Sequence, residues 1–293
     1  MKLRIALVIA VLAVASFLLW PRERTPATRP LVCYVGGTMR PVFEELARVY
    51  REKTGRRIDI TSAGSGELMA TIEMHKEGDL YVCHDPFMDI LMKRGLGVNA
   101  WRVAELVPVL IVQKDNPKGI KSLKDLQRPD VKVCLTDYDH STLGHMLPRI
   151  FERAGINFAE LNAKKEIETH RSGSQVANLL IMKACDAALV WQAVAHLRKD
   201  KLDVIRIDED LPRPGVDVIT SATGKPYPLM PVKVTISSLS CSERQADSED
   251  FVDFVTSEEG KRIFKDFGFT VTEESGRAEY INGARTPKDE EAP

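Results

Sequence analysis

Apolar residues along this chain alternate between short continuous runs and longer stretches in which they recur every three to four positions. Short runs of this kind predict strands, and the periodic stretches predict helices. The strands predicted in the first part of the chain are 31–35, 57–61 and 79–83. The helices predicted to follow them are 39–54, 67–76 and 87–94. This alternation favours an α/β domain with a largely parallel sheet.

A longer apolar run at 106–113 ends in a turn cluster, after which the alternation begins again. Strands are predicted there at 131–135 and 187–191, and helices at 143–154 and 174–184. A strand at 232–239 and helices at 246–256 and 258–267 complete the pattern. We therefore predict two α/β lobes separated by a cleft, with the long strands 106–113 and 232–239 as the crossovers between them.

The boundaries follow from these elements and from the length of 293 residues, which suits two lobes better than one small core. Lobe I is predicted at 31–112 together with 229–272, and lobe II at 113–228. Residues 273–293 are rich in acidic groups and lack apolar periodicity, so we predict a disordered tail.

The N-terminal segment, residues 1–30, has the pattern of an export signal or membrane anchor followed by a linker. Lys2 and Arg4 precede an uncharged apolar run at 5–20, and a proline-rich stretch follows at 21–30. Bulky residues end the run, so no clear cleavage site is present, and both a cleaved signal and a retained anchor remain open. We expect the body of the protein in the periplasm or otherwise outside the cytoplasm.

The charge balance argues against a nucleic-acid partner. The formal net charge is −1, and removal of residues 1–30, which carry five basic groups and one acidic group, leaves the body at −5. A body without a broad basic field does not suit nucleic acid. An anionic ligand would therefore have to be held by local dipoles.

The cysteines are odd in number and widely spaced, which does not suit a disulfide framework. Three of them fall in predicted strands, where buried free thiols are expected. The five are Cys33, Cys83, Cys134, Cys185 and Cys241.

Two short groupings could be interpreted as catalytic or metal sites. In Cys83-His84-Asp85, adjacent residues of a strand point to opposite faces, which disfavours a thiol beside its base. His140 and His145 are five positions apart, whereas a helical metal pair is usually four apart, so we expect solvated histidines. We predict no catalytic residues and no direct metal ligands.

Four turns share one pattern, in which small or hydroxyl residues follow a predicted strand and begin a helix. They are Gly36–Met39, Ala63–Gly66, Ser141–Gly144 and Ser172–Ser174. A helix start has unpaired N–H groups and a partial positive charge, glycine allows close approach to the backbone, and Ser or Thr adds a donor. Each turn alone could be an ordinary N-cap. Together, two in each lobe, they favour a site that encloses an oxyanion with neutral donors.

Several runs resemble the periplasmic molybdate-binding proteins, which are solute-binding components of ABC importers. In the first lobe these runs are GGTMRPVFEELARVYREKTG, ITSAGSGELMATIE and GDLYVCHDPFMD; DAALVW and TSEEGKRIFKDFGFTV match later parts. The likeness spans about residues 31–272 and implies a two-lobed type II periplasmic-binding fold. It also implies that Asp85 is a structural cap.

The resemblance implies a set of ligand-binding positions. The first two turns would supply hydroxyl and backbone N–H donors, and the second lobe would supply N–H groups at helix starts. A tyrosine hydroxyl of the family is replaced here by an indole. The implied positions are Thr38, Ser65, Leu143 or Gly144, Gly173 and Trp191.

The resemblance therefore implies a monomeric receptor without a cofactor that captures molybdate or tungstate and meets a membrane permease. Receptors for sulfate or phosphate are an alternative. A ligand-sensing domain of a transcription regulator shares the fold but would need a DNA-binding helix-turn-helix. An exported hydrolase is a further alternative, and no nucleophile-elbow motif supports it.

Overall fold

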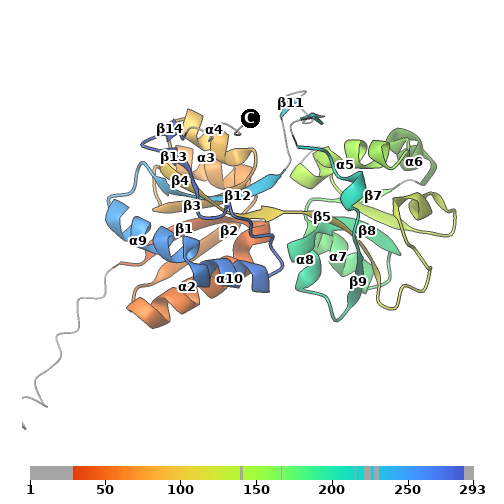
Figure 1. Ribbon diagram of the computed structural model, residues 1–293, viewed down its shortest axis with the longest axis horizontal. Helices are drawn as coiled ribbons and strands as arrows, with labels where there is room; N and C mark the ends of the chain where they lie inside the picture. The colour runs from red at the N-terminus through yellow and green to blue at the C-terminus, as the bar shows by residue number, and fades with distance from the viewer. Residues whose placement is uncertain are drawn as a thin grey trace, which may run out of the picture. The chain divides into compact units, whose positions relative to one another are not determined.

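Two β-sheets organise the chain from Leu31 onward, each with helices packed against it (Figure 1). The computed structural model describes residues 29–138, 141–165, 167–214, 216–220, 226–227 and 231–286. Residues from Leu31 on form one compact unit. The two α/β lobes predicted from the sequence are present as the two sheets with their helices.

The first sheet has seven strands in the order β14-β13-β4-β12-β3-β1-β2. β1, β2 and β3 are parallel, whereas β12 is antiparallel to both β3 and β4. The strands are β1 (Leu31–Gly36), β2 (Ile58–Ala63), β3 (Leu80–His84), β4 (Gly97–Leu106), β12 (Val232–Leu239), β13 (Ala278–Ile281) and β14 (Ala284–Arg285).

Helices cover both faces of this sheet, with α2, α9 and α10 on one face and α3 and α4 on the other (Figure 1). Edge-to-face ring pairs join the first group, including Phe43 with Phe264 at 5.8 Å between centroids. The elements are η1 (Gly37–Met39), α2 (Arg40–Thr54), α3 (Ser65–His75), α4 (Phe87–Lys93), α9 (Gln245–Thr256) and α10 (Glu258–Asp266).

The second sheet has five strands in the order β7-β6-β8-β5-β9, with β6 parallel to β7 and β8. The strands are β5 (Pro108–Gln113), β6 (Val133–Thr136), β7 (Glu168–His170), β8 (Ala187–Trp191) and β9 (Leu202–Ile205). The helices are η2 (Leu123–Gln127), α5 (Thr142–Arg153), α6 (Phe158–Lys165), α7 (Gly173–Ile181), α8 (Gln192–His196) and η3 (Asp208–Asp210). A separate pair of short strands is β10 (Ile219–Thr220) and β11 (Pro226–Tyr227).

The chain first passes from the first sheet to the second at Val107, so the predicted strand 106–113 is observed from Pro108 onward, with the crossover near its start. β4 ends at Leu106 in the first sheet, and β5 begins at Pro108 in the second. Proline has no N–H for the β-ladder, so the first sheet cannot continue through Pro108. Residues 108–112 therefore lie in the second sheet, although the sequence placed them in lobe I.

The strand β12 is also not a crossover, because it lies wholly within the first sheet. Its first residue, Val232, pairs with Leu106 and its last, Leu239, pairs with Gly97. The chain therefore enters the first sheet before or at Val232.

The predicted disordered tail 273–293 is wrong for the residues that the structure describes there. β13 pairs with β4, and β14 pairs with β13, which extends the first sheet to its edge. Tyr280 is buried and its hydroxyl donates to Asp89 at 2.8 Å. Backbone pairing to an existing edge strand stabilises this segment without any apolar periodicity of its own. Residues 287–293 lie outside the described part.

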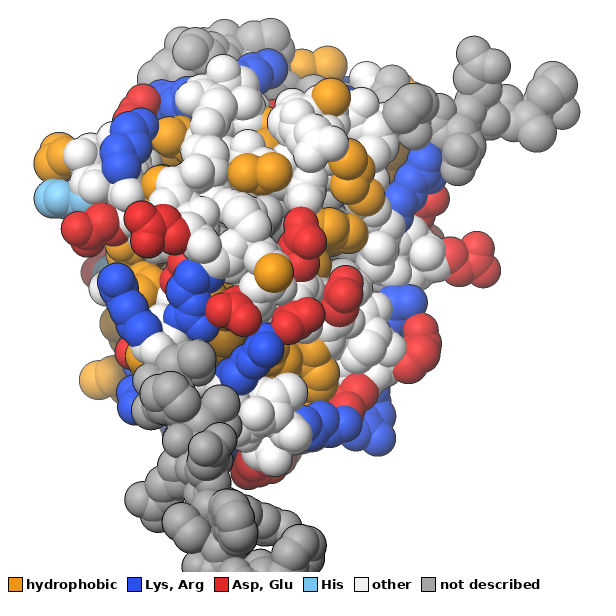
Figure 2. Space-filling model, turned by 90° about the vertical axis from the view of Figure 1, so that its left-hand side faces the viewer, with side chains coloured by type: hydrophobic (Ala, Val, Ile, Leu, Met, Phe, Trp, Pro, Cys, Tyr) orange, Lys and Arg blue, Asp and Glu red, His pale blue; other side chains and the backbone are white. Residues whose placement is uncertain are grey.

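In the described part of the chain, no helix is long and apolar enough to cross a membrane. The predicted signal or anchor at 5–20 lies outside that part. Figure 2, which views the side of the first sheet, shows basic and acidic side chains interspersed rather than gathered by sign. Ion pairs of this lobe illustrate the mixing, such as Arg48 with Glu45 and Glu52.

Candidate functional site

The turns predicted to bind an anion all follow parallel strands at their carboxyl ends. In the first sheet Gly36 ends β1, and Ala63, which pairs with it, ends β2. In the second sheet, β6 and β7 are parallel and precede α5 and α7. Ligands of open α/β sheets bind outside the carboxyl ends of the strands, so each pair of turns lies at the expected edge of its sheet.

The first-lobe turns lie against each other. A Cβ atom on Gly36 would come within 2.6 Å of the Ser65 hydroxyl oxygen, so any larger residue there would have to displace this side chain. Ser65 is buried, and its backbone carbonyl accepts a hydrogen bond of 2.8 Å from the Tyr81 hydroxyl. Thr38, in η1, is half-buried, and its hydroxyl bonds to none of the described residues. Thr38 and Ser65 therefore stand on adjacent turns of one lobe.

In the second lobe, the structure separates the roles of Leu143 and Gly144. The Ser141 hydroxyl accepts a hydrogen bond of 2.8 Å from the Gly144 N–H, which makes it the N-cap of α5. The Gly144 N–H is thus already used. Leu143 takes no part in this cap and remains a candidate ligand position.

Gly144 has a steric role instead. A Cβ atom there would lie 2.0 Å from the backbone oxygen of Asp137, in the loop that precedes the helix. Any side chain would push α5 away from that loop. The glycine thus lets the helix start pack closely against the end of β6.

The Gly173 turn is built in the same way. The Ser172 hydroxyl accepts from the Gln175 N–H at 3.2 Å and caps α7, whose first residue is Gly173. Within the described residues, nothing accepts from the Gly173 N–H. Gly173 packs beside Val190 of β8, the strand that leads to Trp191.

Side chains of the two lobes meet at His84, a residue that the sequence analysis did not include in the site. His84 ends β3, and its ring centroid lies 6.3 Å from that of Trp191, which ends β8. Its Nδ1 lies 3.5 Å from the Thr142 hydroxyl at the start of α5. Trp191 is buried. Its contact with His84 places this indole, which stands where the sequence analysis expected a tyrosine, at the junction of the lobes.

The protonation of His84 follows from its surroundings. Nδ1 lies 2.9 Å from the Asp85 carbonyl oxygen, to which it can donate when it carries the proton. Burial lowers the pKa of His84, while this backbone bond opposes that shift. Burial therefore favours the neutral form of the ring.

Asp85 fastens β3 to β12, which agrees with the structural role implied by the resemblance. Its carboxylate accepts from the Lys233 N–H at 2.9 Å, and its own N–H donates to the Lys233 carbonyl at 3.0 Å. Burial raises the pKa of Asp85 to about 6, with the Lys233 charge opposing that shift. Cys83 packs in the core beside Tyr81, two residues before it on the same strand, as the predicted alternation of faces requires. Burial raises the pKa of the Cys83 thiol.

The remaining histidine interpretation concerns His140 and His145. His140 lies outside the described residues, so the pair stays a prediction.

Of the five cysteines, four are buried and Cys241 is half-buried, and none is in a disulfide.

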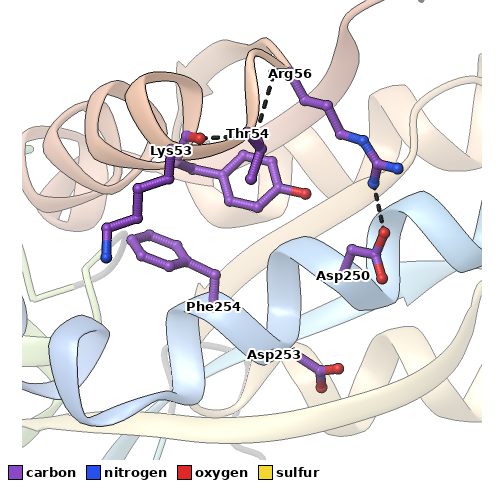
Figure 3. Close-up of a pocket in the computed structure, with 7 residues that line it drawn as sticks. Lys53, Thr54, Arg56, Asp250, Asp253 and Phe254 are labelled. Carbon is purple, nitrogen blue, oxygen red and sulfur yellow. Dashed lines mark hydrogen bonds and ion pairs between the residues drawn. The ribbon is translucent and has the colours of Figure 1, made fainter.

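A surface pocket lies away from these turns, between the C-terminal end of α2 and α9 (Figure 3). Its cavity of about 490 Å³ is lined by Lys53, Thr54 and Phe254 among others, and Arg56 bonds to Asp250 at its rim. None of the six predicted ligand positions lines it. It therefore lies apart from the predicted anion-binding positions.

Two α/β lobes joined at Val107, with helix starts of both lobes at the carboxyl ends of parallel strands, define a type II periplasmic-binding fold. The chain belongs to the family of bacterial extracellular solute-binding proteins, whose sequence profile matches residues 31–270. Membership places it among extracytoplasmic solute-binding proteins and confirms the predicted fold class.

Relatives by sequence include a Haemophilus influenzae binding protein, 27% identical over 240 residues that cover 82% of this chain and 90% of the relative. The molybdate-binding protein ModA of Mycobacterium tuberculosis is 24% identical over 252 residues, covering 85% of this chain and 87% of ModA. The predicted resemblance to molybdate-binding proteins is thereby confirmed at low identity.

Solved structures show the same fold with different ligands named. The Azotobacter vinelandii periplasmic molybdate-binding protein superposes with a TM-score of 0.65 and 16% identity, covering 83% of this chain and 100% of that one. The sulfate-binding protein SubI of Mycobacterium tuberculosis gives a TM-score of 0.63 at 14% identity, covering 85% and 88%. At these identities the likeness establishes the fold and not the ligand.

Proposed function

We propose that this protein binds one tetrahedral oxyanion, molybdate or tungstate, in the cleft between its lobes and presents it to the permease of an ABC importer. The observation that carries the proposal is the meeting of both lobes at His84, Thr142 and Trp191, beside helix starts from each lobe. It acts as a receptor and not as an enzyme.

The donor set suits an oxyanion without counter-charge. Thr38 and Ser65 supply hydroxyl and backbone N–H groups from lobe I, and Leu143 and Gly173 supply backbone N–H groups from lobe II. Helix N-termini favour negative charge through their dipoles, and such donors act most strongly when water is excluded. Selection among oxyanions would then depend on cavity size and donor number.

A receptor for sulfate is the second candidate, because a sulfate-binding protein has the same fold. Trp191 and His84 bear on the choice. The resemblance implies one tyrosine hydroxyl at this position of the molybdate-binding proteins. Here the imidazole of His84 and the indole N–H of Trp191 stand there instead, so the number of hydrogen-bond donors offered to the anion differs.

A thermal-shift series tests the proposal directly, since a ligand that binds only the folded state raises its stability. Purified protein would be melted with molybdate, tungstate, sulfate and phosphate at equal concentration and ionic strength. We expect molybdate and tungstate to raise the Tm more than sulfate or phosphate. A larger shift with sulfate would favour the second candidate, and no shift with any of the four would refute oxyanion binding.

We also propose that the native protein is monomeric and that the apolar run 5–20 keeps part of it on the membrane, with the body outside the cytoplasm. Cell fractionation with mass spectrometry of the mature N-terminus tests the anchor. A wholly soluble protein that begins between residues 17 and 30 would instead show ordinary signal cleavage. Sedimentation of the body as a dimer would refute the monomer.

A further inference from the structure

The edge of the second sheet brings together three side chains of the types that bind metal ions. In β6, Cys134 pairs with Glu168 of the edge strand β7, and His170 follows two residues later on β7. Because side chains two residues apart share a face, Glu168 and His170 lie on the face that Cys134 occupies. The Cys134 sulfur, a Glu168 carboxylate oxygen and a His170 ring nitrogen all lie within 4.8 Å of one another.

The three side chains differ in how far they are exposed to solvent. Cys134 is buried and His170 is partly buried, while the Glu168 side chain is 68% exposed. The His170 Nε2 is sealed from solvent, lies 3.1 Å from a Glu168 oxygen, and has no well-aligned hydrogen bond among the described residues. Its contact with the Glu168 oxygen is poorly aligned for a hydrogen bond, and a metal ion bound by both groups would satisfy the ring nitrogen better.

The spacing is close to that of a tetrahedral zinc site. Zinc lies about 2.3 Å from thiolate sulfur and about 2.1 Å from imidazole nitrogen or carboxylate oxygen, so its ligands stand about 3.3–3.8 Å apart. The three donor atoms need to approach by about 1.5 Å at most, and the exposed Glu168 side chain can move at little cost. Thiolate, imidazole and carboxylate together suit zinc better than magnesium or calcium, which prefer oxygen alone.

We infer that Cys134, Glu168 and His170 form a site for one zinc ion at this edge of the second sheet. The three residues supply three of four tetrahedral positions. The fourth falls to water on the exposed side or to Cys185, the neighbouring thiol. The Cys185 thiol lies beside that of Cys134 and interacts with it.

A disulfide between Cys134 and Cys185 would compete with metal binding. An exported protein meets an oxidising compartment, in which Cys134 and Cys185 could form a disulfide and remove the thiolate ligand. In the structure both thiols are free. The state of Cys134 in the secreted protein therefore decides between the two.

Cobalt(II), which replaces zinc and gives thiolate-to-metal charge-transfer absorption, is the probe for the test. Reduced, metal-free protein would be titrated with cobalt and the bound cobalt then displaced with zinc. We expect one equivalent with a charge-transfer band, loss of the band in Cys134→Ser, and at least tenfold weaker binding in His170→Gln. Cys241→Ser and His75→Gln are matched controls at a half-buried thiol and an exposed histidine of the other lobe, and should bind cobalt as the unaltered protein does.

The outcomes that overturn the site are equally defined. They are the absence of a charge-transfer band, a band that survives in Cys134→Ser, or a Cys134–Cys185 disulfide found by mass spectrometry in the secreted protein before reduction. If Cys134→Ser does not fold, His170→Gln and Glu168→Gln carry the test, because neither side chain is fully buried. Molybdate titration of Cys134→Ser reports on the anion site separately, so a loss of cobalt binding with molybdate binding retained would assign the effect to the metal site.

Discussion

Two hydroxyl side chains of lobe I, Thr38 and Ser65, are the residues on which the account of the cleft depends most. Thr38→Ala and Ser65→Ala each remove one donor to a buried anion, worth about 1.5–3 kcal/mol for a charge-assisted bond. We therefore expect each to weaken molybdate binding by about 10- to 100-fold, since about 1.4 kcal/mol corresponds to tenfold. Isothermal titration calorimetry measures this.

The matched control for these variants is Thr61→Ala, which removes an exposed hydroxyl from β2 in the same lobe. It should bind molybdate as the unaltered protein does, and all three variants should melt near the parent Tm without ligand. Unchanged dissociation constants in both Thr38→Ala and Ser65→Ala would show that the anion does not bind at these turns.

Asp85 makes a pH-dependent contribution to folding stability at the residue scale. Burial raises its folded-state pKa to about 6, above its ordinary value of 3.8. The protonated carboxyl is therefore favoured in the folded state, and its contribution is complete below about pH 4 and is lost as pH rises through about 6. Asp85→Asn removes this loss and keeps a side-chain oxygen for the Lys233 N–H.

The measurement is the free energy of unfolding of both proteins by denaturant at several pH values from 3.5 to 7.5. The difference between Asp85→Asn and the unaltered protein should shift in favour of the variant by about 3 kcal/mol as pH rises. Parallel stability curves would mean that the carboxyl is not perturbed.

At the scale of an element, the end of β1 sets the distance between the first two turns. In Gly36→Ala the new methyl group would meet the Ser65 hydroxyl at 2.6 Å and the end of the Met39 side chain at 2.7 Å. We expect the Ser65 donor to be displaced and molybdate affinity to fall at least tenfold. The measurement is again calorimetric.

Gly37→Ala is the matched control, because its nearest neighbour would be the Ala63 carbonyl oxygen at 3.8 Å, an ordinary contact. The neighbouring glycine should therefore tolerate alanine with little change in affinity. Equal losses in both variants would point to a general disturbance of the turn rather than to the position of Ser65.

The sequence predicts elements well where local pattern determines them, as for the predicted helix 39–54, which is observed as η1 and α2. It fails where long-range pairing decides. The apolar run 106–113 is continuous through Pro108, so hydropathy alone does not locate the change of sheet at Val107. Tyr280 lies in a polar tail by composition, yet its strand pairs with β4.

The candidate site shows the same division. The four turns could be found because a strand, small residues and a helix follow one another locally. His84 was missed because its partners, Thr142 and Trp191, are distant in sequence and belong to the other lobe. Its position at the carboxyl end of β3, next to β1, was the available signal.

At the scale of the whole molecule, the anion can contact both lobes only when they are closed. The described residues connect the first sheet to β5 through Val107 alone, and a short connection between rigid lobes can act as a hinge. We expect small-angle scattering to show a smaller radius of gyration with saturating molybdate than without it. An identical radius in both states would indicate a cleft that is already closed.

The central claim is that one oxyanion is held by donors from both lobes, and the anomalous scattering of molybdenum in crystals grown with molybdate tests it most directly. The account predicts one strong peak within hydrogen-bonding distance of the Thr38 and Ser65 hydroxyls and of the Leu143 and Gly173 N–H groups. A peak bound by one lobe only, or located in the pocket between α2 and α9, would contradict it.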